Sequence, residues 1–223
     1  MSKEQEREEL HRAIWQIAND LRGSVDGWDF KSYVLEMLFY RFISENLTNY
    51  LNKAEHEAGN ADFDYAKLSD EEARFGKDGT VKEKGFYILP SQLFNNVRAN
   101  AKNDEDLNET LGKVFNGIED SAKGTVSEPD CKGLFDDLDV NSNKLVNTVT
   151  KRNEKVVKIM DAIGGLNLGE VKDNTIDTFG DAYEFLMTMY ASSPGKSGGE
   201  FFTPHEASAR VARIQVEGKT SSN

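Results

Sequence analysis

Apolar residues recur at spacings of three and four over long stretches of the chain, which is the pattern of amphipathic helices. Stretches of this kind run over residues 4–22, 29–53, 104–118, 151–163 and 177–192. The second of them carries two overlapping sets of apolar positions, and the resulting wide face predicts a helix in the centre of the core. The pattern therefore predicts a mostly α protein whose N-terminal part is a helical bundle.

Two short signals predict where helices begin. Asp29 is expected to be the N-cap of the long helix, with Trp28 and Tyr33 packed against each other as a hydrophobic staple. Ser69 and Glu72 have the spacing of a capping box, which predicts a short helix after Ser69.

The middle of the chain is less regular. Residues 59–64 and 123–133 are predicted to be loops, and residues 76–85 are polar and contain glycines. The run from Phe86 to Leu89 is prone to form a strand, but Pro90 follows it at once. At most one short strand is therefore predicted in this region.

The composition narrows the class of protein. Of the 223 residues, 38% are apolar and 30% are charged, which is typical of a soluble globular protein. No run of about 18 apolar residues is present and the opening residues are polar, so neither a membrane span nor a secretory signal is expected. The single cysteine, Cys131, has no internal partner for a disulfide, which favours the reducing cytoplasm and a cytoplasmic protein.

The net charge of −12 disfavours a protein that binds nucleic acid with its whole surface, so any contact with DNA must be local. Residues 144–158 have the opposite sign, with five cations, one acid and a net charge of +4. We predict that this segment contacts DNA phosphates through Lys151, Arg152, Lys155 and Lys158. The three lysines among them share one helical face. An ordinary solvated helix face is the alternative explanation.

A segment near the C-terminus has the features of a ligand-binding helix start. Two glycines come before Phe201 and Phe202, and then Thr203, Pro204 and Glu206 have the order of an N-cap, a first helical residue and a capping-box partner. The backbone N–H groups of such a start favour a carboxylate or phosphate, and the aromatic rings can stack on a flat or charged ligand. The alternative is an ordinary capped helix with its aromatic residues in the core.

Two motifs carry a resemblance to a known family. The sequence G-D-A-Y-E-F-L occupies residues 180–186, and G-E-F-F-T-P occupies residues 199–204. At this spacing the pair resembles the motifs before the catalytic domain of the modification (methyltransferase) subunit of type I restriction–modification systems. The resemblance extends over essentially the whole chain, including the segments at residues 30–41 and 134–142.

That family binds S-adenosylmethionine, and the resemblance implies that the F-T-P block closes over the methionine part of the cofactor. A helix N-terminus suits the cofactor carboxylate, and aromatic rings suit its sulfonium. The cofactor contacts that the resemblance implies in this chain are Glu200, Phe201, Phe202, Thr203, Pro204 and His205.

The catalytic motifs of the family are absent from this chain. The catalytic domain is expected to contain a D-P-x-x-G-S-G turn and an N-P-P-[FY] motif, but the four prolines include no adjacent pair. We therefore predict an N-terminal helical domain at residues 1–175 and the start of a truncated α/β Rossmann-like methyltransferase domain at residues 176–223. The chain alone would contain no catalytic residue and would be inactive. Its three scattered histidines support no metal site.

For an intact subunit, the resemblance implies transfer of a methyl group from S-adenosylmethionine to adenine N6 in DNA. It also implies assembly with a specificity subunit, a second methyltransferase subunit and the restriction subunit. The helical domain would help to enclose DNA and support contacts between subunits. The alternative is a stand-alone helical interaction module with no catalytic companion, which would not bind S-adenosylmethionine.

Overall fold

The structure is a computed structural model that describes residues 3–20, 27–136, 138–141, 148–166 and 178–191. Within these ranges the chain forms helices and no strand, which confirms the predicted mostly α fold. The α-helices are α1 (Lys3–Asp20), α2 (Gly27–Glu57), α3 (Asp70–Arg74), α4 (Lys77–Lys84), α5 (Phe94–Asn100), α6 (Leu107–Ala122), α7 (Glu128–Cys131), α8 (Val149–Gly164) and α9 (Thr178–Ala191). The 3₁₀ turns are η1 (Tyr65–Lys67), η2 (Pro90–Gln92) and η3 (Ala101–Asn103).

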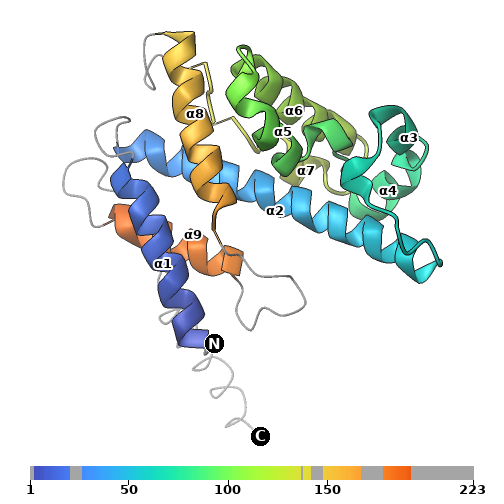
Figure 1. Cartoon of the computed structure of the whole chain (residues 1–223), viewed down its shortest axis with the longest axis horizontal. Helices are drawn as coiled ribbons and strands as arrows, with labels where there is room; N and C mark the ends of the chain where they lie inside the picture. The colour runs from blue at the N-terminus through green and yellow to red at the C-terminus, as the bar shows by residue number, and fades with distance from the viewer. Residues whose placement is uncertain (1–2, 21–26, 137, 142–147, 167–177, 192–223) are drawn as a thin grey trace, which may run out of the picture.

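α2 is the axis around which the other helices pack (Figure 1). Its 31 residues give it a length of about 46 Å. α9 packs on α2 and α1 packs on α9, while α3 and α4 lie near the C-terminal end of α2. The side chains of α2 that are at most 2% exposed include Tyr33, Val34, Met37, Leu38, Tyr40 and Leu47. The prediction of a central core helix is confirmed.

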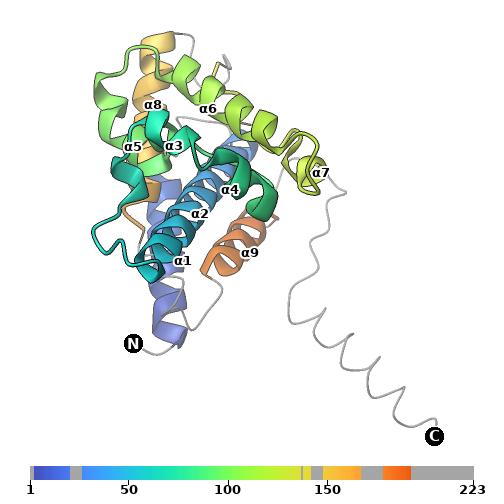
Figure 2. The same ribbon diagram turned by 90° about the vertical axis from the view of Figure 1, so that its right-hand side faces the viewer.

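A cluster of aromatic side chains joins α2 to α5 and α6. The Tyr40 ring lies edge-on to the rings of Phe94 and Phe115, with 5.5 Å between the centroids in both pairs. Phe115 in turn stacks on Phe135 at 4.3 Å. Burial raises the pKa of Tyr40, so its hydroxyl keeps the proton that it donates to the Gln92 carbonyl. Figure 2 shows that α6 and α9 lie on different sides of α2.

The capping box predicted at Ser69 is present at the start of α3. The Glu72 N–H donates to Ser69 Oγ (3.3 Å), and the Ser69 N–H donates to the Glu72 carboxylate (2.9 Å). Asp70 accepts hydrogen bonds from the N–H (2.9 Å) and the hydroxyl (2.6 Å) of Ser91. These bonds fix the start of α3 against η2.

The prediction that Asp29 is the N-cap of α2 is wrong. α2 begins at Gly27, so Asp29 already lies in its first turn. A carboxylate in the first turn interacts favourably with the helix dipole. This interaction explains why Asp29 stands near the start of α2 although it is not the N-cap. The Trp28 side chain of the predicted staple lies outside the described side chains.

The short strand predicted at residues 86–89 is absent. The segment has no partner strand within the described part of the chain, and its backbone contacts a helix instead. The Tyr87 N–H donates to Ser121 Oγ of α6 (2.8 Å). Aromatic and β-branched residues are prone to form strands because they suit a half-buried surface. Here Tyr87 and Ile88, which are 3% and 0% exposed, fill the core without a sheet.

Two segments that were predicted to be irregular contain short helices. α4 occupies most of residues 76–85, but Thr80 is its one buried residue, so the sequence has no apolar face that would predict a helix. The helix ends at Gly85, whose φ of +80° is a left-handed conformation that glycine adopts readily. α7 is a four-residue turn of helix within the loop predicted at residues 123–133.

Candidate nucleic-acid interface

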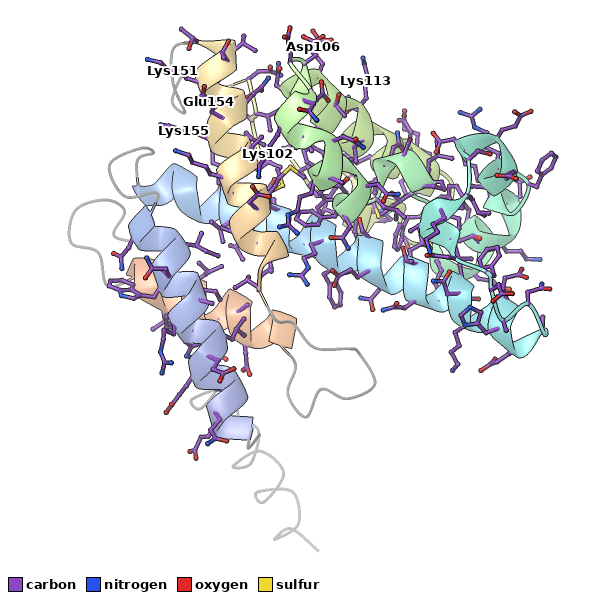
Figure 3. All side chains as sticks on the ribbon, viewed as in Figure 1. Lys102, Asp106, Lys113, Lys151, Glu154 and Lys155 are labelled. Carbon is purple, nitrogen blue, oxygen red and sulfur yellow. The ribbon has the colours of Figure 1, made fainter. Side chains whose placement is uncertain are left out.

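Three lysines, here called the α8 stripe, lie along one side of α8: Lys151, Lys155 and Lys158. Lys151 and Lys158 are exposed, and Lys155 is partly exposed. Figure 3 shows Lys151 and Lys155 pointing away from α5 and α6. The buried side of the same helix consists of Val156, Ile159, Met160 and Ile163. The spacing of four and three residues therefore produces a row of ammonium groups on an open surface.

Arg152 lies on a different side of α8. It is 8% exposed, and Asn153 beside it is 6% exposed. Because so little of Arg152 is exposed, it is not part of the exposed row of lysines. The candidate contacts on α8 are reduced from the four predicted cations to the three lysines of the stripe.

Two carboxylates on α8 affect the charge near the stripe. Glu154 is exposed, whereas Asp161 forms ion pairs with Lys102 Nζ (2.9 Å) and Arg98 Nε (3.1 Å). Hydrogen bonds from Lys102 and Arg98 lower the pKa of Asp161, so its carboxylate is charged and already balanced by two cations. Asp161 therefore subtracts little from the positive potential of the stripe.

The electrostatics of the stripe and of the start of α8 both favour an anion. Burial and the charge of Lys158 lower the pKa of Lys155, and a phosphate placed near both ammonium groups would relieve their repulsion. The first turn of α8 contains no acidic residue, and the Thr148 side chain does not cap it. Because the N–H groups at a helix start carry partial positive charge, this end of α8 has the same sign as the stripe.

The G-D-A-Y-E-F-L motif lies on α9, and its side chains contact α1. Asp181 accepts hydrogen bonds from Nε (2.9 Å) and Nη2 (3.0 Å) of Arg7. Phe185 stacks on His11, with 4.1 Å between the ring centroids and 11° between the planes. Among the motif side chains that the structure describes, Ala182 and Leu186 are 0% exposed. In the described structure, this motif fixes α9 among the other helices.

The cofactor contacts implied by the resemblance lie outside the described residues: Glu200, Phe201, Phe202, Thr203, Pro204 and His205. In sequence they are close to the described part, because α9 ends at Ala191, nine residues before Glu200. Their role stays a prediction that the family resemblance implies and with which the chemistry of their residue types agrees.

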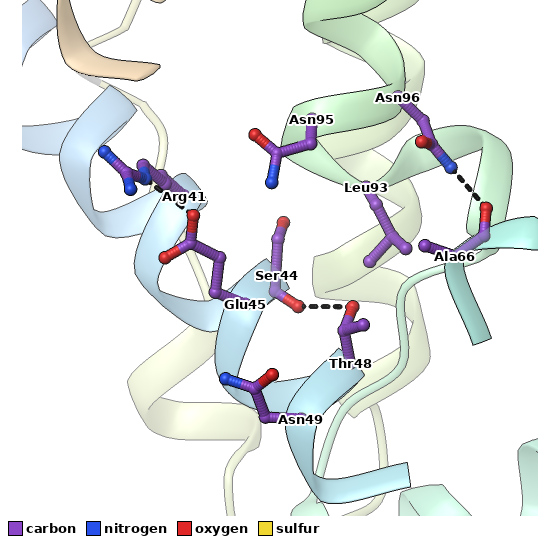
Figure 4. A pocket seen from close by; sticks show the side chains of 9 residues that line it. All are labelled: Arg41, Ser44, Glu45, Thr48, Asn49, Ala66, Leu93, Asn95 and Asn96. Atoms are coloured by element: carbon purple, nitrogen blue, oxygen red, sulfur yellow. Dashed lines mark hydrogen bonds and ion pairs between the residues drawn. The ribbon is translucent and has the colours of Figure 1, made fainter. Parts of the chain in front are cut away.

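A polar pocket that the sequence analysis did not predict lies between α2 and α5 (Figure 4). Its volume of about 290 Å³ is at the small end of the range for ligand sites. The Arg41 guanidinium at its edge donates to Glu45 and to the carbonyls of Ile163 and Leu166, so both charges of the pocket are already engaged. Arg41, a charge within the apolar run of α2, is the sequence signal that could have indicated it. We assign the pocket no function, because it offers no free catalytic group.

In the described part of the chain, neither a reactive thiol, nor a metal site, nor a membrane-spanning helix is supported. Cys131 is buried, and burial raises the pKa of its thiol, which makes it a poor nucleophile. No group of three His, Cys, Asp or Glu side chains is placed to hold a metal in the ranges that the structure describes. None of the described helices has both the length and the apolarity needed to cross a membrane.

The stack of His11 on Phe185 is expected to make the protein less stable in acid. Burial lowers the pKa of His11 below its ordinary value of 6.5, although the charge of Asp181 opposes this shift. The folded state therefore favours the neutral ring, and this contribution to stability is complete above pH 6.5 and is lost as the pH falls through the lower pKa of the folded state. The thermal midpoint of the wild type should fall more on acidification from pH 7.5 to 5 than that of His11→Phe, which keeps the stack without titrating. Equal falls in the two proteins would contradict this expectation.

The sequence matches two protein families and curated relatives. The family described as HsdM N-terminal domain matches residues 10–163, and the family described as N-6 DNA Methylase matches residues 174–222. The chain is 49% identical to the type I restriction enzyme MpnII methylase subunit of Mycoplasma pneumoniae, over 96% of this chain and 41% of that protein. It is 20% identical to the type I restriction enzyme MjaIX methylase subunit of Methanocaldococcus jannaschii, over 92% of this chain and 35% of that protein.

A solved structure is similar over almost the whole chain. The crystal structure of the type I restriction-modification system methyltransferase subunit from Streptococcus thermophilus matches with a TM-score of 0.76 at 26% identity, covering 97% of this chain and 45% of that one. The chain thus spans less than half the length of these relatives. Because the match at residues 10–163 is well over half of the chain, this protein belongs to the HsdM N-terminal domain family.

Proposed function

We propose that this chain is the N-terminal part of the methyltransferase subunit of a type I restriction–modification enzyme. The observation that carries the proposal is the 49% identity, over 96% of the chain, to a type I methylase subunit. The chain spans 41% of that relative, so the activity proposed is that of the intact protein. We place that protein in the cytoplasm, where its DNA substrate and its cofactor meet.

The proposed reaction is transfer of a methyl group to N6 of adenine in DNA. When bound, S-adenosylmethionine would supply the methyl group from its positively charged sulfur. The bond between that sulfur and the methyl carbon breaks as the new C–N bond forms, neutral S-adenosylhomocysteine is left, and the adenine amine releases one proton to solvent. In this chain the helix start at Thr203 would bind the cofactor carboxylate, and the rings of Phe201 and Phe202 would face the sulfonium. The full set assigned to the cofactor is Glu200, Phe201, Phe202, Thr203, Pro204 and His205. The catalytic residues are assigned to the part of the intact subunit that this chain does not contain.

We assign residues 1–175 to a helical domain and residues 176–223 to the start of the α/β Rossmann-like catalytic domain. The family matches, which end at residue 163 and begin again at residue 174, support a division in this region. The proposed partners are DNA, a specificity subunit that selects the sequence, a second methyltransferase subunit and the restriction subunit. The α8 stripe is the surface that we assign to DNA phosphates, and the helical domain helps to enclose the DNA.

The cofactor assignment predicts a specific loss of affinity in the full-length subunit. Phe202→Ala is expected to raise the Kd for S-adenosylmethionine about fivefold to tenfold, because an aromatic ring on a cation contributes about 0.5–2 kcal/mol. Thr203→Ala should cause a similar loss, since an N-cap contributes about 1 kcal/mol to its helix start. Isothermal titration calorimetry measures both, and Phe75→Ala is the control because Phe75 is 90% exposed in the helical part. An unchanged Kd in both variants would remove this block from the cofactor site.

A further inference from the structure

An ion-pair cluster beside the α8 stripe contains more positive than negative charge. The Asp161 carboxylate lies 2.9 Å from Lys102 Nζ of η3 and 3.1 Å from Arg98 Nε of α5. Two cations and one carboxylate leave a net charge of +1 in the cluster. Asp161 comes one helical turn after Lys158, the last lysine of the stripe, so the cluster adjoins the stripe. Figure 3 shows Lys102 close to α8.

The two cations of the cluster differ in how firmly the protein holds them. The Lys102 side chain is 69% exposed, whereas the Arg98 side chain is 32% exposed. The Arg98 guanidinium also lies against the backbone of α8, because a methyl group on Gly164 would be 2.4 Å from Arg98 Nη1. Lys102 has a flexible stem and a single ammonium group that solvent already reaches. Lys102 is therefore the cation that can leave Asp161, and Arg98 is the one that stays.

We propose that Lys102 exchanges the Asp161 carboxylate for a DNA phosphate, which extends the α8 stripe onto η3. This inference rests on the proposed function, because it takes the stripe as the surface that contacts DNA. After the exchange Arg98 still pairs with Asp161, so this carboxylate keeps a cationic partner beside the phosphate. Lys102 then neutralises one more phosphate, and the counterion of that phosphate is released.

The acidic residues around Lys102 define where this surface ends. Glu154 is exposed on α8, two helical turns before Asp161, and the surplus positive charge of the cluster offsets it. Glu105 and Asp106 follow Lys102 in the chain, and both are exposed. Their negative charge repels phosphates, so the contact with DNA should stop at Lys102 and not continue along α6.

The experiment measures the affinity of the full-length subunit, assembled with its specificity subunit, for a fluorescent DNA duplex at several salt concentrations. Lys102→Gln is expected to weaken binding about threefold to fivefold, and to make the slope of log affinity against log salt less steep by about one. Lys123→Gln is the matched control, because Lys123 is also 69% exposed and also pairs with an aspartate (Asp120, 2.6 Å). Lys123 follows the end of α6 that lies away from α8 (Figure 2), so this variant should change neither the affinity nor the slope.

A second variant tests the exchange itself. Asp161→Asn removes the carboxylate that competes with the phosphate for Lys102, so DNA binding should become about threefold tighter. Part of this gain comes from the lost negative charge alone, and that part remains when Lys102 has already been replaced. The gain from Asp161→Asn should therefore be smaller in the Lys102→Gln background than in the wild type.

Each outcome decides the question. If Lys102→Gln loses no more affinity than Lys123→Gln, Lys102 is only a structural partner of Asp161 and the proposal is wrong. An equal gain from Asp161→Asn in both backgrounds would show that Lys102 does not leave the carboxylate, which also overturns the exchange. A wild-type complex that does not bind DNA would instead overturn the proposed function, and this result is seen before any variant is compared.

Discussion

Replacement of Lys151, Lys155 and Lys158 by glutamate is expected to weaken DNA binding by the assembled enzyme on the order of 10²-fold at moderate salt. The three lysines form an exposed row on α8, and the other side of that helix is buried. In a plot of log affinity against log salt concentration, each phosphate contact makes the slope steeper by about one. Loss of three contacts should therefore make this slope less steep by about three. Because phosphate contacts do not read sequence, the loss should be similar on specific and unrelated DNA.

A second triple variant separates this effect from a general change in charge. Lys53, Lys77 and Lys82 are also exposed, and they lie on the C-terminal part of α2 and on α4, away from α8 (Figure 1). Their replacement by glutamate changes the net charge by the same amount and should have little effect on DNA affinity. Fluorescence anisotropy at several salt concentrations measures both variants. DNA affinity that is unchanged by reversal of the α8 stripe would show that the stripe is an ordinary solvated helix face.

Tyr40→Ala is expected to lower the free energy of unfolding by about 3–5 kcal/mol, the largest effect on stability in the described core. Tyr40 is 0% exposed and contacts the rings of Phe94, Phe115 and Phe135. Removal of the ring leaves a cavity between α2, α5 and α6, and it also leaves the Gln92 carbonyl without the hydroxyl that donates to it. Urea unfolding, followed by circular dichroism at constant pH, measures the difference.

Two further variants divide the Tyr40 effect into its parts. Tyr40→Phe keeps the ring and removes the hydroxyl, so we expect a loss of about 1–3 kcal/mol from the unpaired Gln92 carbonyl. Phe75→Ala removes an aromatic ring that is 90% exposed and should leave the free energy of unfolding unchanged. A loss in Tyr40→Ala no larger than that in Phe75→Ala would mean that the aromatic cluster does not hold α2 to α5 and α6.

The helices that the sequence predicts are those with a buried apolar stripe. α6 is an example, since Leu107, Leu111 and Ile118 repeat at helical spacing and are all 0% exposed. α4 lacks such a stripe, so its helical form depends on its ends, where Gly85 takes a left-handed conformation beside the α6–α7 connection. The extended segment at Tyr87 is a second case that local pattern does not decide. Its residue types predict that it is buried, but tertiary contacts determine that it packs on a helix and not beside another strand.

The candidate DNA surface could be predicted more fully than the ion pair between α1 and α9. Helical spacing alone places the three lysines of the stripe together, and it also places Arg152 on the side of Val156 and Ile159, four and seven residues further on. The burial of Arg152 was therefore available from the sequence. The pairing of Arg7 with Asp181 was not, because no local pattern connects residues 174 positions apart.

The measurement that tests the central claim most directly is methyl transfer by the full-length subunit assembled with its specificity subunit. The complex would be incubated with S-adenosylmethionine labelled in the methyl group and with genomic DNA from a host that lacks the modification system. The account predicts that the label appears in N6-methyladenine and that omission of the specificity subunit abolishes it. A complex that assembles and binds DNA but leaves adenine unlabelled would contradict the claim, and the stand-alone interaction module would then be the better description of this protein.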